Sequence, residues 1–429
     1  MRILHLTAGT GRWHCGTCIR DDALVKALRA LGHEADLVPM YLPVVADGIS
    51  CSAGERVQIS GVNAWLQQEV PLFRHLPRWM DAPLASRPVL DLAGRFAGST
   101  RPESLGAMTV SMLQGLEGHQ AKEIGRLVDA LRLRPAPDVV VLSNSLLVGL
   151  AQPLRDALGV PVVVTVQGEL HFLDALDEGR DEAWALVAEG LARAEGVVAV
   201  SGFAADAMAA RTGLPRDRFD VVHNGIDVEG YGPLRPPEGP PVLGAFARLY
   251  PAKGLHLLVD VYLRLLEQGR DLDLHLGGTL NPGDRPELDE ALQRLHDAGV
   301  AHRVQVAANL SAEEKRAFLA ELTVFCVPSL KDETFGMYNL EAMATGLPVV
   351  APRRGAIPEV LERAGAGTLV APGDAEAFVA AIGRLLDDAA LRHAQAERGR
   401  RGVRAAFTSA HMAAGLADLL QRVLAVRAA

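Results

Sequence analysis

The sequence predicts an α/β protein made of two doubly wound domains, each built on a parallel sheet. Short apolar runs typical of buried strands alternate with segments of helical periodicity along the whole chain. A proline- and glycine-rich run from residue 229 to 241 interrupts this alternation, which then starts again. We therefore expect one domain over residues 1–235 and a second over residues 236–407.

Six apolar runs are expected to form the sheet of the first domain. They are Arg2–Thr7, Ala35–Pro39, Asp138–Leu142, Pro161–Val166, Gly196–Val200 and Phe219–His223. The segment Asp21–Leu31 has helical periodicity and ends at Gly32, a residue type that favours the turn after a helix. Residues 41–120 are less regular, and a packed insertion, an acceptor pocket, a dimer contact and a membrane-surface patch all stay open for them.

The second domain repeats the pattern with six further strand candidates. They are Val242–Ala247, Leu272–Gly277, Arg303–Ala307, Val324–Val327, Pro348–Ala351 and Gly367–Val370. The tail from Thr408 to Val426 has apolar residues at helical spacing, so we expect an amphipathic helix over about 408–429. Ligands of doubly wound sheets bind at the carboxyl ends of the strands, where the strand order reverses.

Composition and charge narrow the class of protein. The 429 residues include 49% hydrophobic ones, but no apolar run approaches the roughly 20 residues that cross a bilayer. The start, residues 1–9, reads as a first strand and is too short for a signal peptide. Four cysteines do not suggest a disulfide framework, so we expect a cytoplasmic location. The formal net charge of −9 argues against nucleic acid as a partner.

The segment 331–351 is the most informative part of the chain. It places two carboxylates, Glu333 and Glu341, eight positions apart between one strand candidate and the next. Glu333 is expected in a loop and Glu341 in the helix that follows Phe335-Gly336-Met337. The free backbone N–H groups of such a helix N-terminus bind anions, and carboxylates accept hydrogen bonds from hydroxyl groups. A nucleotide sugar requires both features: N–H groups that donate hydrogen bonds to its phosphates, and carboxylates that accept hydrogen bonds from its hydroxyl groups.

These residues resemble the Glu-x7-Glu signature of retaining glycosyltransferases with the GT-B architecture, and family 4 most closely. The resemblance implies two Rossmann-like domains that face one another across a cleft, with the C-terminal helix crossing back to the N-terminal domain. It implies that Glu333 contacts the hydroxyls of the donor sugar and that Glu341 binds the ribose. The amides after Phe335, at Gly336 and Met337, would then face the diphosphate.

Two cations lie in the loop after the first strand of the second domain. Arg248 and Lys253 resemble the family's Gly-Arg-Leu-x-x-x-Lys-Gly motif, in which both residues contact the diphosphate. Cations at that position would stabilise the negative charge that develops when the nucleotide leaves. The structural alternative is a salt bridge for Arg248 and a surface position for Lys253.

The N-terminal loop carries the sequence Cys15-Gly16-Thr17-Cys18. The family usually has two glycines here, and Gly16 falls at the second one, which approaches the diphosphate. A Cys-x-x-Cys at a helix start leaves three alternatives for Cys15 and Cys18: structural or acceptor-contacting residues, a redox-active pair, or half of a zinc site.

The acceptor side also departs from the family. Gln167 stands where family members carry a histidine, and glutamine can bind a sugar but cannot take a proton. A same-face mechanism needs no enzymic base if the leaving phosphate collects the proton of the acceptor. His171 and Glu169 are candidates for the missing group, although a structural histidine is the simpler interpretation.

The sequence therefore predicts a retaining, metal-independent glycosyltransferase without a cofactor. Its donor would be a nucleotide sugar, UDP- or GDP-linked, and its acceptor a small molecule or glycan. The alternatives are a nucleotide-sugar epimerase or a phosphorylase of the same fold, and a non-catalytic nucleotide-sugar-binding protein. The nucleotide base, the sugar, the acceptor and the oligomeric state are not determined by these residues, and a peripheral membrane contact stays open.

Overall fold

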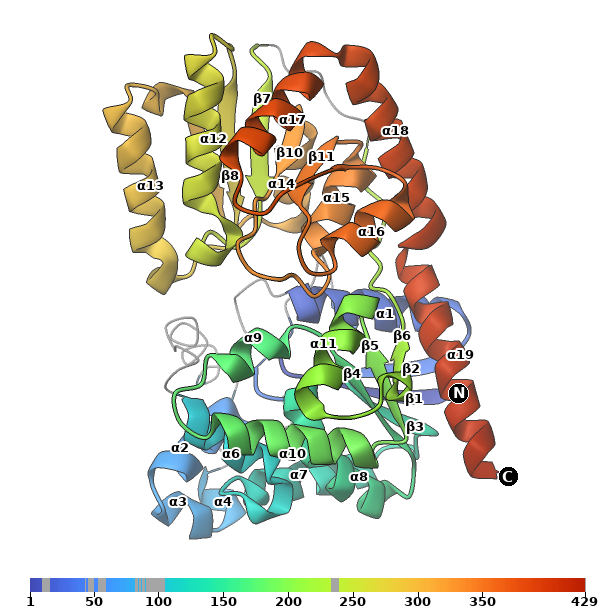
Figure 1. The fold of residues 1–429 in the computed structure, drawn as a ribbon. Coiled ribbons are helices and arrows are strands. Elements are labelled where there is room, and N and C mark those ends of the chain that lie inside the picture. Colours follow the sequence, from blue (N-terminus) through green and yellow to red (C-terminus); the bar gives the residue numbers. More distant parts are fainter. Residues whose placement is uncertain are drawn as a thin grey trace. The chain divides into compact units, whose positions relative to one another are not determined.

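The structure is a computed structural model that describes residues 1–9, 16–42, 44, 50–52, 59–81, 84, 86, 89, 105–232 and 239–428. Its contacts divide the chain into two compact units (Figure 1). Unit 1 comprises Met1–His223 and Ala410–Ala429, and unit 2 comprises Asn224–Ser409. The predicted boundary between residues 235 and 236 falls in a segment, 233–238, that lies outside the described residues.

Unit 1 is built on a six-stranded parallel sheet with the order β2-β1-β3-β4-β5-β6. The strands are β1 (Arg2–Thr7), β2 (Glu34–Pro39), β3 (Val139–Leu142), β4 (Val162–Val166), β5 (Gly196–Ala199) and β6 (Phe219–Val221). The chain adds β2 on one side of β1 and then returns to add β3 on the other. The strand order therefore reverses between β1 and β3, which makes this the switch point of the sheet.

Helices cover this sheet and form the connections between its strands. They are α1 (Gly16–Ala30), α2 (Gly61–Glu69), α3 (Leu72–His75), α4 (Arg78–Asp81), α6 (Gly106–Leu113), α7 (Ala121–Arg132), α8 (Ala151–Leu158), α9 (Glu169–Asp174), α10 (Arg180–Arg193), α11 (Gly202–Thr212) and α19 (Ser409–Ala428), with 3₁₀ turns η3 (Gly115–Glu117), η4 (Ser145–Leu150) and η5 (Arg216–Arg218). Helix α1 begins five residues before the predicted Asp21. The reason is that charged residues, Arg20 and Asp21 among them, are buried in its first turns, so its apolar pattern starts only at Leu24.

The final helix packs on the sheet of unit 1, as predicted (Figure 1). One apolar core joins the strands, helix α1 and helix α19. Its members include Ile3, Val139, Val163 and Val198 from the strands, Leu24 and Leu28 from α1, and Met412, Leu416 and Leu420 from α19. All of these side chains are at most 1% exposed, so helix α19 contributes directly to the hydrophobic core of unit 1.

The described part of residues 41–120 contains a packed helical insertion. Buried charges connect α4 to α7, because the carboxylate of Asp81 pairs with both Lys122 and Arg126. On α7, Glu123 accepts from Arg126 Nη1 at 2.8 Å and from Gln67 Nε2 at 3.1 Å. The insertion also has exposed aromatic residues, of which Trp79 is 76% exposed.

Unit 2 has a second six-stranded parallel sheet with the order β12-β11-β10-β7-β8-β9. Its strands are β7 (Val242–Phe246), β8 (Asp273–Gly278), β9 (Val304–Ala308), β10 (Val324–Cys326), β11 (Val349–Pro352) and β12 (Thr368–Val370). Its helices are α12 (Leu255–Glu267), α13 (Arg285–Asp297), α14 (Ala312–Ala320), α15 (Met337–Thr345), α16 (Ile357–Ala364), α17 (Ala375–Asp387) and α18 (Ala389–Ala406), with 3₁₀ turns η6 (Pro251–Lys253), η7 (Pro282–Asp284) and η8 (Ala301–Arg303). This is the strand order of the Rossmann fold, and it reverses between β7 and β10.

The structure confirms the predicted fold class. All twelve strand candidates are strands, and their ends differ from the predicted ones by two residues at most. Among the described residues, no helix is long and apolar enough to cross a membrane.

Candidate functional site

The switch point of unit 2 lies between β7 and β10, which pair in parallel at the centre of the sheet. The loop after β7 carries Arg248 and Lys253, and the loop after β10 carries Glu333. Because the carboxyl ends of neighbouring parallel strands meet at one edge, the fold brings these predicted site residues to the same place.

Backbone contacts fix the two loops to one another. Leu330 N donates to Ala252 O at 2.9 Å. Gly254 has φ +75°, and a Cβ atom at this position would lie only 2.1 Å from Pro328 O. This close approach requires glycine, so the turn after Lys253 lies directly against the β10 loop.

Lys253 and Glu333 form an ion pair between these loops, from Nζ to Oε1. Ser329 Oγ donates to the same carboxylate oxygen at 2.7 Å. The two side chains are only 18% and 16% exposed, and Lys253 Nζ also lies 5.0 Å from the centre of the Tyr338 ring. Lys253 is therefore not the surface lysine that the structural alternative required.

The backbone of Glu333 is held by the loop that precedes α16. Ala356 N donates to Glu333 O at 2.7 Å. Gly355 has φ +58°, and a Cβ atom there would lie 2.4 Å from the same carbonyl oxygen. The Arg354-Gly355-Ala356 turn thus fixes the backbone from which the Glu333 carboxylate extends.

Arg248 binds a carboxylate that the sequence did not reveal. Its Nε and Nη2 atoms donate to Asp284 Oδ2 and Oδ1 at 2.8 and 3.0 Å. The Asn281 amide, oriented with its oxygen toward the guanidinium, accepts from the same two nitrogens at 3.3 Å. The guanidinium also stacks 4.6 Å from the centre of the Tyr250 ring. The salt-bridge alternative for Arg248 is therefore realised, but the side chain remains 46% exposed and can contact a ligand.

Tyr250 connects the two ion pairs. Burial raises the pKa of its phenol, and the charge of Glu333 raises it further, while Arg248 opposes this effect. The phenol is therefore close to both motifs, and it stays neutral at physiological pH.

Helix α15 begins at this edge with an unusual first turn. Gly336 caps it with φ +81°, and Asn339 N donates to Gly336 O at 3.0 Å, so the N–H groups of Met337 and Tyr338 precede the first hydrogen bond of the turn. Phe335 is buried and packs edge-on against Phe407, with ring centres 6.0 Å apart. The helix start is thus anchored by an apolar side chain while its positive end stays available to an anion.

Glu341 lies one turn further along α15, and its partner is Lys315 of α14. Lys315 Nζ donates to Glu341 Oε1 at 2.8 Å, and the two side chains are 7% and 13% exposed. Sequence reasoning assigned no role to Lys315. The available signal was its position in the apolar stripe of α14, three and four residues before Phe318 and Leu319.

Unit 1 carries the remaining predicted residues. Gly16 is the first residue of α1, is exposed, and a Cβ atom there would contact nothing within 4 Å. Cys18 is buried and 1% exposed, whereas Cys15 lies outside the described residues. The three alternatives for the cysteine pair therefore stay open.

Gln167 and Glu169 form a buried network at the carboxyl ends of β3 and β4. Gln167 Nε2 donates to Ser143 O at 2.7 Å. Glu169 accepts from the backbone N–H groups of Ser145 and Gln167 at 2.7 and 2.5 Å. Burial raises the pKa of Glu169, although these hydrogen bonds favour its charged form. Both side chains are thus engaged in positioning the loops, while His171 is exposed on α9.

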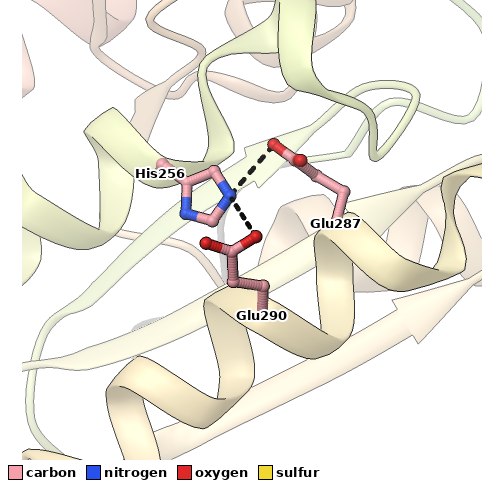
Figure 2. A group of neighbouring side chains, drawn as sticks. All are labelled: His256, Glu287 and Glu290. Atoms are coloured by element: carbon pink, nitrogen blue, oxygen red, sulfur yellow. Dashed lines mark ion pairs between the residues drawn. The ribbon is translucent and has the colours of Figure 1, made fainter.

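A separate cluster on α12 and α13 has the composition of a metal site (Figure 2). His256 Nε2 lies 3.1 Å from Glu287 Oε1 and 4.0 Å from Glu290 Oε2. On the other side of the ring, Arg294 Nη1 lies 3.4 Å from His256 Nδ1. A guanidinium can only donate, so Nδ1 accepts and Nε2 carries the proton that faces Glu287. The cluster is therefore a closed hydrogen-bonded set rather than a preformed metal centre.

Solved structures define the fold class of the chain as GT-B. Sucrose-phosphate synthase from Thermosynechococcus elongatus superposes with a TM-score of 0.70 at 19% identity, covering 99% of this chain and all of the other. Anabaena Alr3699/HepE, solved in complex with UDP and glucose, superposes with a TM-score of 0.69 at 17% identity, covering 98% of this chain and all of the other.

Family models and curated relatives then define the family. The model for Glycosyl transferases group 1 matches residues 232–402, and the model for Glycosyltransferase Family 4 matches residues 109–229. The α-maltose-1-phosphate synthase of Mycolicibacterium smegmatis is 31% identical over 317 residues, which are 67% of this chain and 79% of that protein. The chain belongs to this family of GT-B glycosyltransferases.

Other relatives align over a smaller part of their length. The MMP α-(1→4)-mannosyltransferase of Mycolicibacterium hassiacum is 31% identical over 210 residues, which are 49% of each protein. The chain thus spans about half the length of several curated relatives that it matches.

Proposed function

We propose that the chain is a retaining glycosyltransferase that moves a sugar from a nucleoside diphosphate sugar to a hydroxyl group of an acceptor. The observation that carries this proposal is the meeting of two cations, two carboxylates and a helix N-terminus at the switch point of unit 2. The cations are Arg248 and Lys253, the carboxylates are Glu333 and Glu341, and the helix is α15. A family relationship to glycosyltransferases and a related fold solved with UDP and glucose support it.

The leaving diphosphate is the group that the cations would stabilise. When the bond from the sugar C1 to the phosphate oxygen breaks, negative charge builds up on the distal phosphate. Arg248, Lys253 and the first amides of α15 are donors to that charge, and they bind it more strongly in the transition state than in the ground state. In this proposal no metal is required, because the two side chains supply the positive charge.

The carboxylates would bind the two sugars of the donor. Glu333 has one oxygen bound by Lys253 and Ser329. Its second oxygen is the acceptor for hydroxyls of the transferred sugar. Glu341, one turn into α15, is the acceptor for the ribose.

The configuration at the sugar C1 is retained if the acceptor attacks from the same face that the phosphate leaves. The new bond joins C1 to the acceptor oxygen, and the acceptor proton passes to the departing phosphate oxygen. Gln167 cannot take a proton, and Glu169 is buried and bonded to backbone amides. This arrangement supports a mechanism without a dedicated enzymic base. A cytoplasmic location remains a prediction.

A panel of UDP-, GDP- and ADP-sugars tests the proposal by thermal shift. The midpoint should rise with the concentration of the matching donor, because a ligand that binds only the folded state stabilises it. Release of free nucleoside diphosphate then measures turnover with candidate acceptors. Absence of a shift with every donor would contradict the assignment.

Two variants test whether the proposed site residues are needed for transfer and not for folding. Lys253→Ala and Glu333→Gln should each abolish transfer while the thermal midpoint of the free protein changes little. Lys331→Ala, an exposed lysine two residues before Glu333, is the matched control and should keep normal turnover. Formation of an epimerised donor without any acceptor would instead favour an epimerase.

A further inference from the structure

A buried hydroxyl group without a partner lies at the start of helix α15. Tyr338 is the second residue of this helix, and its ring packs against the Phe325 ring of β10 with centres 6.3 Å apart. The hydroxyl oxygen is buried and has no hydrogen-bond partner among the described residues. Such groups are rare in proteins, because a buried polar atom loses its hydrogen bonds to water. The hydroxyl of Tyr338 is therefore unfavourable in the free protein, where a phenylalanine would avoid the loss.

This hydroxyl lies close to the ion pair between Lys253 and Glu333. Lys253 Nζ lies 5.0 Å from the centre of the Tyr338 ring and pairs with Glu333 Oε1. Burial raises the pKa of Tyr338 well above its usual value, and the negative charge of Glu333 raises it further. The phenol thus keeps its proton at physiological pH, so it can donate a hydrogen bond to a carboxylate.

Binding of a diphosphate would change the partners of Glu333. In the structure its Oε1 atom accepts from Lys253 and from Ser329 Oγ, and the side chain is only 16% exposed. If Lys253 turns to a phosphate, this shielded carboxylate loses its cation and keeps the Ser329 donor. A carboxylate that loses its ion pair in a shielded position is unfavourable. A second donor would offset that loss, and the unpartnered hydroxyl of Tyr338 can supply it.

We propose that Tyr338 is a positioning residue that donates to Glu333 when Lys253 leaves this carboxylate for the diphosphate of the donor. The hydroxyl then holds the carboxylate in place for the transferred sugar. This inference rests on the proposed function, because it requires Lys253 to bind a diphosphate. It adds a residue between the two glutamates to which sequence reasoning assigned no role.

The test measures affinity for a nucleoside diphosphate by isothermal titration calorimetry. UDP, GDP and ADP are titrated into the wild-type protein, and the one that binds best is used for the variants. Tyr338→Phe keeps the ring and removes only the hydroxyl, so the diphosphate has to take Lys253 from Glu333 without a replacement donor. The affinity should fall about tenfold, which corresponds to about 1.4 kcal/mol, close to the contribution of one hydrogen bond to a charged group.

Glu333→Gln shows whether the hydroxyl acts through the carboxylate. A neutral amide does not retain Lys253 as a carboxylate does, so the release of this lysine no longer needs a replacement donor. In the Glu333→Gln background, Tyr338→Phe should therefore change the affinity less than about twofold. A tenfold loss in both backgrounds would mean that the hydroxyl contacts the phosphate directly, and it would overturn the proposal.

Tyr262→Phe is the matched control, because it removes a buried hydroxyl of the same unit that does have a partner. Tyr262 Oη donates to Leu272 O at 3.1 Å. This variant should lower the thermal midpoint of the free protein and leave the affinity unchanged. Tyr338→Phe should show the opposite pattern, with an unchanged or higher midpoint and a lower affinity. A midpoint that falls as far as that of Tyr262→Phe would reveal a structural hydroxyl and contradict the proposal.

The outcomes separate this inference from the proposed function. If none of the three nucleoside diphosphates binds the wild-type protein, the proposed function fails and the inference fails with it. If one of them binds, and Tyr338→Phe binds it equally well, the inference about Tyr338 fails alone.

Discussion

Asp284→Asn tests whether the orientation of Arg248 matters for catalysis. In the structure both oxygens of Asp284 accept from the guanidinium, at 2.8 and 3.0 Å. Asparagine keeps the size of the side chain but replaces one acceptor by an amide donor that faces another donor. We expect the guanidinium to leave its present position without any change in the fold.

The magnitude follows from the number and the exposure of these bonds. A hydrogen bond to a charged group contributes about 1.5–3 kcal/mol when buried. Arg248 is 46% exposed, so each bond is discounted toward the value for exposed pairs, and the two together contribute about 1–2 kcal/mol. At about 1.4 kcal/mol per tenfold, kcat/KM should fall roughly 5- to 30-fold.

The assay is release of nucleoside diphosphate from the donor identified by thermal shift. Arg248→Ala should reduce kcat by about 10²–10³-fold, the usual effect of removing one donor to a developing anion. The double variant should be no worse than Arg248→Ala, because Asp284 acts through Arg248. Asp289→Asn on α13, the helix that follows Asp284, removes an exposed ion pair with Arg285 and serves as the control. Independent, multiplicative losses in the double variant would refute the reasoning.

Two further predictions concern stability and metals. Burial alone would raise the pKa of Asp21, but His5 and Arg20 lower it from 3.8 to about 2. The charged carboxylate therefore stabilises the fold by about 2 kcal/mol above pH 4, and this contribution is lost as the pH falls from about 4 to 2. Asp21→Asn should lower the urea midpoint at pH 7 and flatten its decline in that acid range; an unchanged acid profile would contradict the prediction. Because the His256 ring is committed to hydrogen bonds, neither Zn²⁺ nor EDTA should change nucleotide release by more than about twofold, and His256→Gln should behave like the wild type. A zinc-dependent rise in the thermal midpoint that this substitution removes would show a metal site.

The strands were predictable because buried parallel strands consist of nearly continuous apolar residues. Val139–Leu142, for example, is buried at every position. The start of α1 was missed for the opposite reason. Its first turns bury Arg20 and Asp21, and a charged residue in a sequence indicates a surface unless its partners are known.

The candidate site likewise contains residues that the sequence indicates and partners that it does not. Arg248, Lys253, Glu333 and Glu341 could be proposed as site residues because each belongs to a compact motif that follows a strand. Their partners were not, because the chain brings them from a distance: Asp284 is 36 residues from Arg248, and Lys315 is 26 residues from Glu341. Only the fold reveals such pairings.

Lys253, Arg248 and Lys315 each contact an acidic side chain of the protein itself. This edge of unit 2 is accordingly close to electroneutral, and a pyrophosphate that binds there would take over cations that already have counterions. Binding of the pyrophosphate would therefore replace the protein's own carboxylates as the counterions of these cations. Small anions such as chloride or orthophosphate gain little from it, whereas a ligand that contacts several of these cations at once can replace the internal carboxylates. Discrimination against abundant cellular anions would then follow from the ion pairs of the protein itself.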